Sequence, residues 1–334
     1  MKIVHHRRKA ESMEREEFFE SSGAKIYGTL TLPEEGEDFA ACLFIGGALP
    51  QTREGDVDNS KVDWFPHPLP ERKLFHDEAK ILKQIGIATF RYDKRGCGKS
   101  EGDINTTGLL DLVDDARMAL RWLRNLPEVD SERVGILGQS EGAIIAQILA
   151  AEDPGIRFIV WQGGAYNNLD GIIRWQAEAF WKLDSEVINK MRQSAPLIYW
   201  KYKQLDDLIV SAQRGERFFQ LGDQDWSFRC YLPWYKEHFD NPPLRFVDKV
   251  KCPVLILHGE LDHNSPLTEA EQAQQALIDA GNTNVTMHIF SGLDHSFRRL
   301  ENPDEDFVTA MKRPLDPVMP EALTNWLRSF SIPG

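Results

Sequence analysis

Short, continuous runs of apolar residues recur along the chain and alternate with longer stretches of helical character. The apolar runs predict six buried strands, at residues 41–45, 87–91, 133–138, 156–161, 253–258 and 285–290. Two more strands are expected between Glu16 and Leu32, as an antiparallel hairpin around Ser22-Gly23-Ala24. Strands that are apolar throughout are typical of a sheet buried on both faces. The pattern therefore predicts an α/β protein with a mostly parallel, eight-stranded sheet and helices on both faces.

The helices expected between these strands follow from the same pattern. The clearest covers residues 109–125, where apolar residues recur at helical spacing. They are Leu109, Leu112, Val113, Ala116, Ala119, Leu120 and Leu123. A helix is also expected at residues 71–84, and Pro320 to Phe330 closes the chain as another.

One segment interrupts the alternation. Between Gly164 and Cys252 lie about eighty residues, far more than an ordinary connection needs. Five of the nine tryptophans fall within it, and several of its stretches are helix-forming. We interpret it as a helical, aromatic-rich cap inserted after the sixth strand. This divides the chain into a core in two parts, 1–164 and 246–334, with the cap at 165–245.

The strand at 133–138 leads directly into the sequence Gly-Gln-Ser-Glu-Gly at 138–142, and a helix-forming stretch follows. A G-x-S-x-G motif between strand and helix is typical of a nucleophile elbow, a tight turn that holds its serine exposed above the sheet. Alone the motif is weak, but this setting makes it a strong signal. Ser140 is therefore the candidate nucleophile for acyl transfer.

A serine nucleophile needs a histidine base and an acid that orients it, and such an elbow predicts the acid first and the histidine last along the chain. Asp262 follows the strand at 253–258, and His295 follows the strand at 285–290. Both are expected at the edge of the sheet that carries Ser140. Glu260 and Asp294 are close rivals for the acid, but Asp262 has the expected distance from the end of its strand.

The developing negative charge of an acyl-transfer intermediate requires an oxyanion hole. One donor is expected to be the backbone N–H of Glu141, the residue after the nucleophile. The other is expected from the glycine-rich loop after the strand at 41–45, with the N–H of Ala48 as the candidate. The Glu141 side chain, in the first turn of a helix, is expected to complement the helix dipole.

Four segments together resemble the α/β-hydrolase superfamily: residues 90–100, 138–142, 258–262 and 294–297. Within it they are similar to bacterial carboxylesterases that have a Ser-Glu-Gly elbow and a Tyr-Asp-Lys-Arg-Gly loop. The likeness runs from about residue 17 to about residue 330, apart from the divergent middle section. The resemblance implies the α/β-hydrolase fold and ester hydrolysis through an acyl-enzyme, with no cofactor.

The residues that contact substrate are harder to assign. Gly47, Trp64, Trp175 and Trp226 are the candidates, because they come from the oxyanion loop, the long loop after it and the cap. Most aromatic residues of the cap are expected to form its own core, and a few to line the pocket below.

The composition of the chain limits the kinds of partner and ligand that we expect. The formal charge of −13 argues against nucleic acid, which requires a basic face. No apolar run reaches the length of a membrane span, and the basic N-terminus lacks the apolar stretch of a secretory signal. The four cysteines have no C-x-x-C spacing, and the histidines form no metal-binding pattern. We expect free thiols, no metal, a cytoplasmic location and a small-molecule substrate; the oligomeric state stays open.

Several functions fit these residues. The leading hypothesis is a serine hydrolase that cleaves a carboxylic ester of a small or medium-sized substrate. The same three residues could instead act on a thioester, an amide or peptide, or a carbon–carbon bond, or transfer the acyl group to an alcohol. A catalytically inactive binding scaffold is the remote alternative. Neither the physiological substrate nor the size of its acyl group follows from the sequence.

Overall fold

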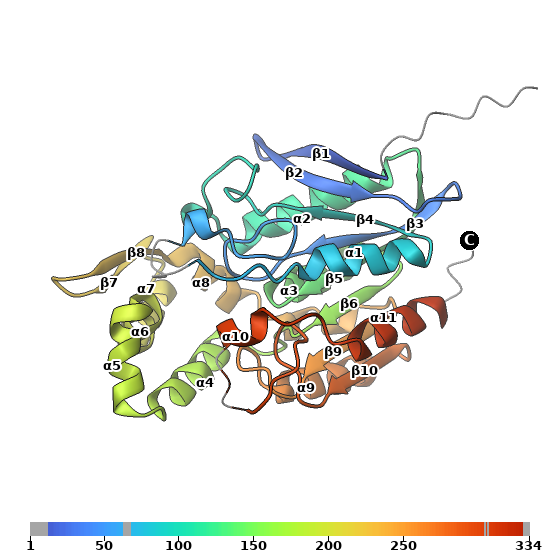
Figure 1. The fold of residues 1–334 in the computed structure, drawn as a ribbon. Coiled ribbons are helices and arrows are strands. Elements are labelled where there is room, and N and C mark those ends of the chain that lie inside the picture. The colour runs from blue at the N-terminus through green and yellow to red at the C-terminus, as the bar shows by residue number, and fades with distance from the viewer. Residues whose placement is uncertain (1–12, 63–67, 304, 306, 330–334) are drawn as a thin grey trace, which may run out of the picture.

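The computed structural model describes residues 13–62, 68–303, 305 and 307–329 (Figure 1). Its centre is one eight-stranded sheet. The strands are β1 (Glu14–Ser21), β2 (Ala24–Thr31), β3 (Phe39–Ile45), β4 (Ile87–Tyr92), β5 (Val129–Gln139), β6 (Ile159–Gln162), β9 (Val254–Gly259) and β10 (Val285–Phe290). They lie in the order β1-β2-β4-β3-β5-β6-β9-β10. The pairs β1–β2 and β2–β4 are antiparallel and the others parallel, so the predicted sheet is confirmed.

Helices cover both faces of this sheet, as predicted (Figure 1). They are α1 (Leu74–Gln84), α2 (Leu109–Arg124), α3 (Glu141–Glu152), α9 (Leu267–Asp279) and α11 (Val318–Ser329). The described side chains of the short helix α10 (Phe307–Met311) contribute to neither of the two clusters formed with the sheet. Helices α2, α3 and α9 share one hydrophobic cluster with the sheet, and α1 and α11 share the other. Successive residues of β9 alternate between the two clusters, because side chains of a strand point to opposite faces in turn.

Several boundaries differ from the prediction by a few residues, and for two of them the structure shows the cause. The helix expected from residue 71 begins at Leu74, because Lys73 has a left-handed backbone with φ 53°. The amide N–H groups of Arg72 and Lys73 both donate to the Asp56 carboxylate instead of entering the helix. The strand expected from residue 156 begins at Ile159, since Ile156 is still held in a turn by its bond to Asp153.

The segment between β6 and β9 is a separate layer with its own hydrophobic cluster (Figure 1). Its main elements are α4 (Leu169–Trp181), α5 (Ser185–Ser194), α6 (Pro196–Lys203), α7 (Leu205–Gln213), β7 (Phe218–Gly222), β8 (Ser227–Tyr231) and α8 (Leu232–Asp240). Five of these elements are helices, and β7 and β8 add an antiparallel hairpin that the prediction of a helical insertion did not include. Asp223 closes its turn by accepting the N–H groups of Asp225 and Trp226. The cluster consists mostly of aromatic and aliphatic residues, as expected for a segment with its own core.

The insertion returns to the main sheet through α8. Glu237 of α8 accepts the N–H of Leu110 at 2.8 Å and so binds the N-terminus of α2. The amide of Gln147 on α3 donates to the carbonyl of Pro243, just after α8. These contacts fix α8 against the two helices that flank the serine motif. No helix in the described part of the chain is long and apolar enough to cross a membrane.

Candidate active site

Ser140 occupies the turn between β5 and α3 in a strained conformation. Its backbone has φ 58° and ψ −117°, which a residue with a side chain rarely adopts. Its N–H donates to the carbonyl of Gln162, at the end of β6, at 2.8 Å. Such strain persists only where the surroundings enforce it, and it is the conformation expected of a nucleophile elbow.

The two glycines of the motif are required by close backbone contacts. A Cβ at Gly138 would lie 2.1 Å from the carbonyl oxygen of Gly142. A Cβ at Gly142 would lie 2.0 Å from the carbonyl oxygen of Ile45, at the end of β3. No side chain fits at either position, since both neighbours are backbone. The turn therefore packs directly against the end of β3, where the predicted oxyanion loop begins.

Asp262 and His295 meet after β9 and β10. Nδ1 of His295 lies 2.6 Å from Oδ2 of Asp262, a charge-assisted contact. The other carboxylate oxygen accepts the N–H groups of Asn264 and Ser265, so the buried carboxylate is fixed in the turn. Burial alone would raise the pKa of Asp262, but the charge and hydrogen bond of His295, with smaller contributions from His258 and Ser265, hold it below 3.8.

This pair lies next to the backbone that holds Ser140. A Cβ built on Gly163 would be 3.0 Å from Nδ1 of His295 and 3.1 Å from Oδ2 of Asp262. Gly163 follows Gln162, whose carbonyl accepts the Ser140 N–H. The chain at the end of β6, residues 162–163, therefore lies against both the serine turn and the Asp–His pair. The three predicted residues gather at the carboxyl ends of β5, β9 and β10.

The rival acids are engaged elsewhere. The carboxylate of Glu260 accepts the hydroxyl of Ser291 at 2.6 Å and the N–H of Gly292 at 3.0 Å. Asp294 accepts the N–H groups of Ser296 and Arg298. Both carboxylates thus close local turns, and Asp262 alone of the three has a recorded hydrogen bond to the His295 ring.

A second histidine, His258, lies beside Asp262 and was missed by the sequence analysis. It is fully buried, Nε2 faces the carbonyl of Ser265 at 3.1 Å, and its ring stacks on Trp161. Burial lowers the pKa of His258, which favours the neutral ring. Its Nε2 is 3.8 Å from Oδ2 of Asp262. Its position in an otherwise apolar strand, four residues before the acid, was the available signal.

The predicted oxyanion loop lies against Ser140. A Cβ on Gly47 would be 3.1 Å from the Cβ of Ser140. The N–H of Gly47 already donates to Oε1 of Gln51 at 2.9 Å. Within residues 13–62 and 68–303, the N–H groups of Ala48 and Glu141 donate to no other group of the protein, which leaves both available to a substrate oxygen.

The Glu141 side chain is the centre of a buried polar cluster that the sequence did not predict. Its Oε2 lies 2.8 Å from Nζ of Lys94, and its Oε1 accepts the indole N–H of Trp234 at 2.6 Å. His238 Nε2 lies 3.3 Å from Oε1. Burial opposes ionisation, but Lys94 and His238 outweigh it and lower the pKa of Glu141 to about 2. The sequence predicted only that this carboxylate would complement the helix dipole, whereas it also binds three side chains.

A second buried carboxyl, Glu78 of α1, supports the end of β6. Its Oε1 accepts the amide of Gln162 at 2.6 Å, and its Oε2 has no partner among the described residues. Burial raises the pKa of Glu78 to about 8, although Gln162, Arg298 and Arg72 oppose the shift.

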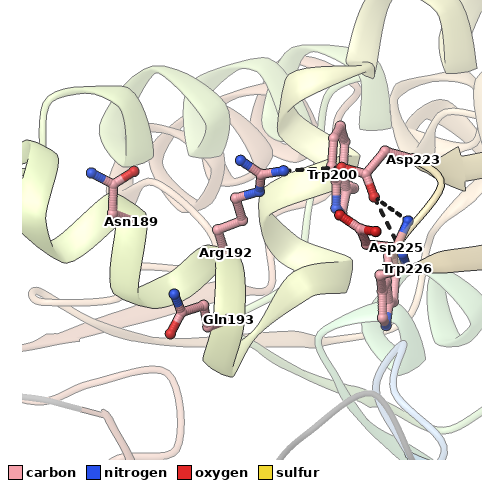
Figure 2. Close-up of a pocket in the computed structure, with 7 residues that line it drawn as sticks. All are labelled: Asn189, Arg192, Gln193, Trp200, Asp223, Asp225 and Trp226. Carbon is pink, nitrogen blue, oxygen red and sulfur yellow. Dashed lines mark hydrogen bonds and ion pairs between the residues drawn. The ribbon is translucent and has the colours of Figure 1, made fainter.

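The remaining substrate candidates stay predictions. Trp64 lies outside the described residues, and Trp175 is half-buried on α4. Trp226 lines a hollow of about 330 Å³ formed by the insertion alone (Figure 2). Its other lining residues are Asn189, Arg192, Gln193, Trp200, Asp223 and Asp225. In the described ranges, no three His, Cys, Asp or Glu residues are grouped as metal ligands, and all four cysteines are unpaired.

The sheet order and the strained serine turn together define the class of the protein, which is an α/β hydrolase. Residues 72–301 match the family described as "Serine aminopeptidase, S33", and the chain belongs to that family. The resemblance that the sequence motifs carried is thus confirmed.

Solved structures of esterases share the fold. The chain is similar to Est1E from Butyrivibrio proteoclasticus with ferulic acid bound, at 17% identity and a TM-score of 0.58 over 92% of this chain and 99% of that one. It is also similar to the Pyrococcus furiosus esterase Pf2001, at 15% identity and a TM-score of 0.58 over 95% of this chain and 90% of that one.

Curated relatives match over smaller shares of their length. An uncharacterized peptidase, YuxL of Bacillus subtilis, is 22% identical over 82% of this chain and 37% of its own. The polyketide transferase claH of Penicillium crustosum is 35% identical over 29% of this chain and 32% of its own. The chain thus spans about a third of the length of these relatives.

Proposed function

We propose that the protein is a serine hydrolase that cleaves a carboxylic ester of a small or medium-sized substrate through an acyl-enzyme. The observation that carries the proposal is the contact of 2.6 Å between His295 and Asp262, beside the strained turn of Ser140. A carboxylate on Nδ1 keeps the proton on that nitrogen and leaves Nε2 free to accept one.

The proposed reaction has two halves. Nε2 of His295 takes the hydroxyl proton as Ser140 Oγ attacks the ester carbonyl, and the amides of Ala48 and Glu141 stabilise the oxyanion. His295 then gives that proton to the leaving alcohol, which departs as the acyl-enzyme forms. In the second half His295 takes a proton from a water molecule as its oxygen attacks the acyl carbon. The bond from that carbon to Ser140 Oγ then breaks, His295 returns the proton to Oγ, and the acid leaves.

In this proposal the insertion, residues 165–245, acts as a cap over the site and selects the acyl group. Contact between its helix α8 and Glu141, next to the serine, supports that arrangement. The substrate is a small molecule, and neither nucleic acid nor a membrane is expected as a partner.

Cleavage of an amide is the second candidate, because the family description names an aminopeptidase. The same triad serves both reactions, and they differ in the leaving group that His295 protonates. Structures of esterases that share the fold favour the ester as the first substrate to test.

Labelling with a fluorophosphonate probe tests the nucleophile. We expect wild type and Ser131→Ala, an exposed serine on β5, to be labelled and Ser140→Ala to remain unlabelled. A folded wild type that resists the probe would refute the hydrolase. A panel of esters of increasing acyl size, assayed beside thioesters and aminoacyl amides, then tests which type of bond is cleaved. Turnover of amides alone would refute the assignment as an esterase but not the proposed triad.

A further inference from the structure

Lys94 is a buried lysine with two acceptors, and both belong to the predicted oxyanion hole. It follows β4 in the loop at 93–100, and its side chain is 5% exposed. Nζ donates to the carbonyl oxygen of Gly47 at 2.7 Å and to Oε2 of Glu141 at 2.8 Å. A buried ammonium group with these two partners thus joins the oxyanion loop to the first residue of α3.

The bond to Gly47 acts on the amide of Ala48. The carbonyl of Gly47 and the N–H of Ala48 belong to one planar peptide unit, in which they point in opposite directions. Gln51 binds the N–H on the other side of Gly47 at 2.9 Å. Gln51 and Lys94 thus bind both backbone polar groups of Gly47. The orientation of the peptide plane between Gly47 and Ala48 is therefore fixed, and the Ala48 N–H points away from the lysine.

The bond to Glu141 acts at the second donor. Glu141 supplies its own N–H to the predicted hole, while its carboxylate binds Lys94. Oε1 of that carboxylate is held from the other side by Trp234 at 2.6 Å and by His238 at 3.3 Å, both on α8 of the insertion. The same cluster therefore connects the two donor residues with the insertion.

A purely structural ion pair is the simpler explanation, and the chain contains one for comparison. Arg95, the next residue, pairs with Asp115 of α2, which is 1% exposed, and its Nε donates to Oδ2 at 3.0 Å. That pair joins the loop to a helix and makes no hydrogen bond to residues 46–48 or 141 in the described part of the chain. Burying an ion pair costs desolvation in both cases, but only Lys94 places that charge on a peptide of the oxyanion hole.

We propose that Lys94 is the positioning residue of the oxyanion hole. It orients the Ala48 amide through the Gly47 carbonyl, and it holds Glu141 so that the two amide donors keep a fixed relative position. This inference rests on the proposed hydrolase function. Its physical basis is preorganisation, because donors that are already aimed at the oxyanion need not reorient during the reaction.

The double variant Lys94→Met/Glu141→Gln tests the inference, because it removes both charges together and leaves neither buried without a partner. Steady-state kinetics on an ester that wild type turns over should show kcat lowered about 100-fold, with KM little changed. The affinity of a trifluoromethyl ketone, whose adduct with a serine carries an oxyanion, should fall by about the same factor as kcat/KM.

The matched control is Arg95→Met/Asp115→Asn, with folding of both double variants followed by circular dichroism and thermal melting. We expect the control to lose stability and to keep kcat and ketone affinity per folded molecule. Lys94→Met/Glu141→Gln with wild-type kcat and ketone affinity would overturn the positioning role, as would an equal loss of kcat in the control.

The activity of wild type distinguishes failure of the hydrolase proposal from failure of the positioning role of Lys94. An inert, unlabelled wild type overturns the hydrolase and this inference together. An active wild type with an equally active Lys94→Met/Glu141→Gln variant overturns the positioning role alone. If that variant melts below the assay temperature, all variants are compared at a lower temperature at which each of them stays folded.

Discussion

Glu78 makes the stability of this protein depend on pH in a direction opposite to that of most carboxylates. The side chain is fully enclosed, and its Oε2 has no partner among the described residues. Burial raises the pKa of Glu78 from an ordinary 4.5 to about 8. Between those two pH values the unfolded chain has lost this proton and the folded chain still holds it, so this contribution to stability falls as pH rises. It is fully present below about 4.5 and is lost by about pH 8.

The size of the effect follows from the shift. One pKa unit corresponds to about 1.4 kcal/mol, so a rise from 4.5 to about 8 amounts to about 5 kcal/mol. Glu78→Gln removes the titration and keeps an oxygen that can accept the amide of Gln162. Its new NH₂ group replaces an oxygen without a partner, which adds a cost of about 1–3 kcal/mol that does not vary with pH.

Urea unfolding at pH 5, 6, 7 and 8 measures this directly. The free energy of unfolding of Glu78→Gln, minus that of wild type, should increase by about 4 kcal/mol across the range. Glu271→Gln, on an exposed site of α9, controls for the loss of a surface carboxylate. A difference between Glu78→Gln and wild type that stays constant with pH would refute the reasoning, because Glu78 would then be ionised in the folded protein.

Three further substitutions test the site. Asp262→Asn should lower kcat about 10⁴-fold with unchanged circular dichroism, because an amide does not select the required imidazole tautomer; activity within tenfold of wild type would exclude Asp262 as the acid. Trp234→Phe removes the indole donor to Glu141 and should cost about 1–3 kcal/mol in urea unfolding, and an unchanged midpoint would show that the bond contributes nothing. Gly142→Ala should abolish fluorophosphonate labelling, since its Cβ would lie 2.0 Å from a backbone oxygen, whereas Gly171→Ala, with open space on α4, should label as wild type does.

The fold was largely predictable because its signals are local. Each buried strand is a continuous apolar run, and a strand such as β9 supplies residues to hydrophobic clusters on both faces of the sheet. The hairpin β7–β8 was not predicted, since its strands are short and their aromatic residues do not distinguish a strand from a helix. The start of α1 depends on the hydrogen bonds that the N–H groups of Arg72 and Lys73 donate to the Asp56 carboxylate, which no local pattern encodes.

Some residues of the candidate site were also predictable from local signals, and others were not. Ser140, Asp262 and His295 could be named because each follows a strand that the sequence marks, and parallel strands end at one edge of the sheet. Lys94 and Trp234 could not, since their common partner Glu141 lies 47 and 93 residues away. The Tyr-Asp-Lys-Arg-Gly loop, in which Lys94 is the second residue after β4, was the local signal, but it did not indicate a bond to Glu141.

The point at which the insertion leaves and rejoins the sheet has an evolutionary consequence. Strands β6 and β9 are hydrogen-bonded neighbours, so the insertion between them can be lengthened, shortened or exchanged without a change in the connectivity of the sheet. A different segment grafted there must still supply a donor to Oε1 of Glu141, because that buried carboxylate oxygen would otherwise be poorly satisfied next to Ser140. In the proposed function the insertion selects the acyl group, so the need for a donor to this one oxygen atom limits which segments could be exchanged to change the substrate range.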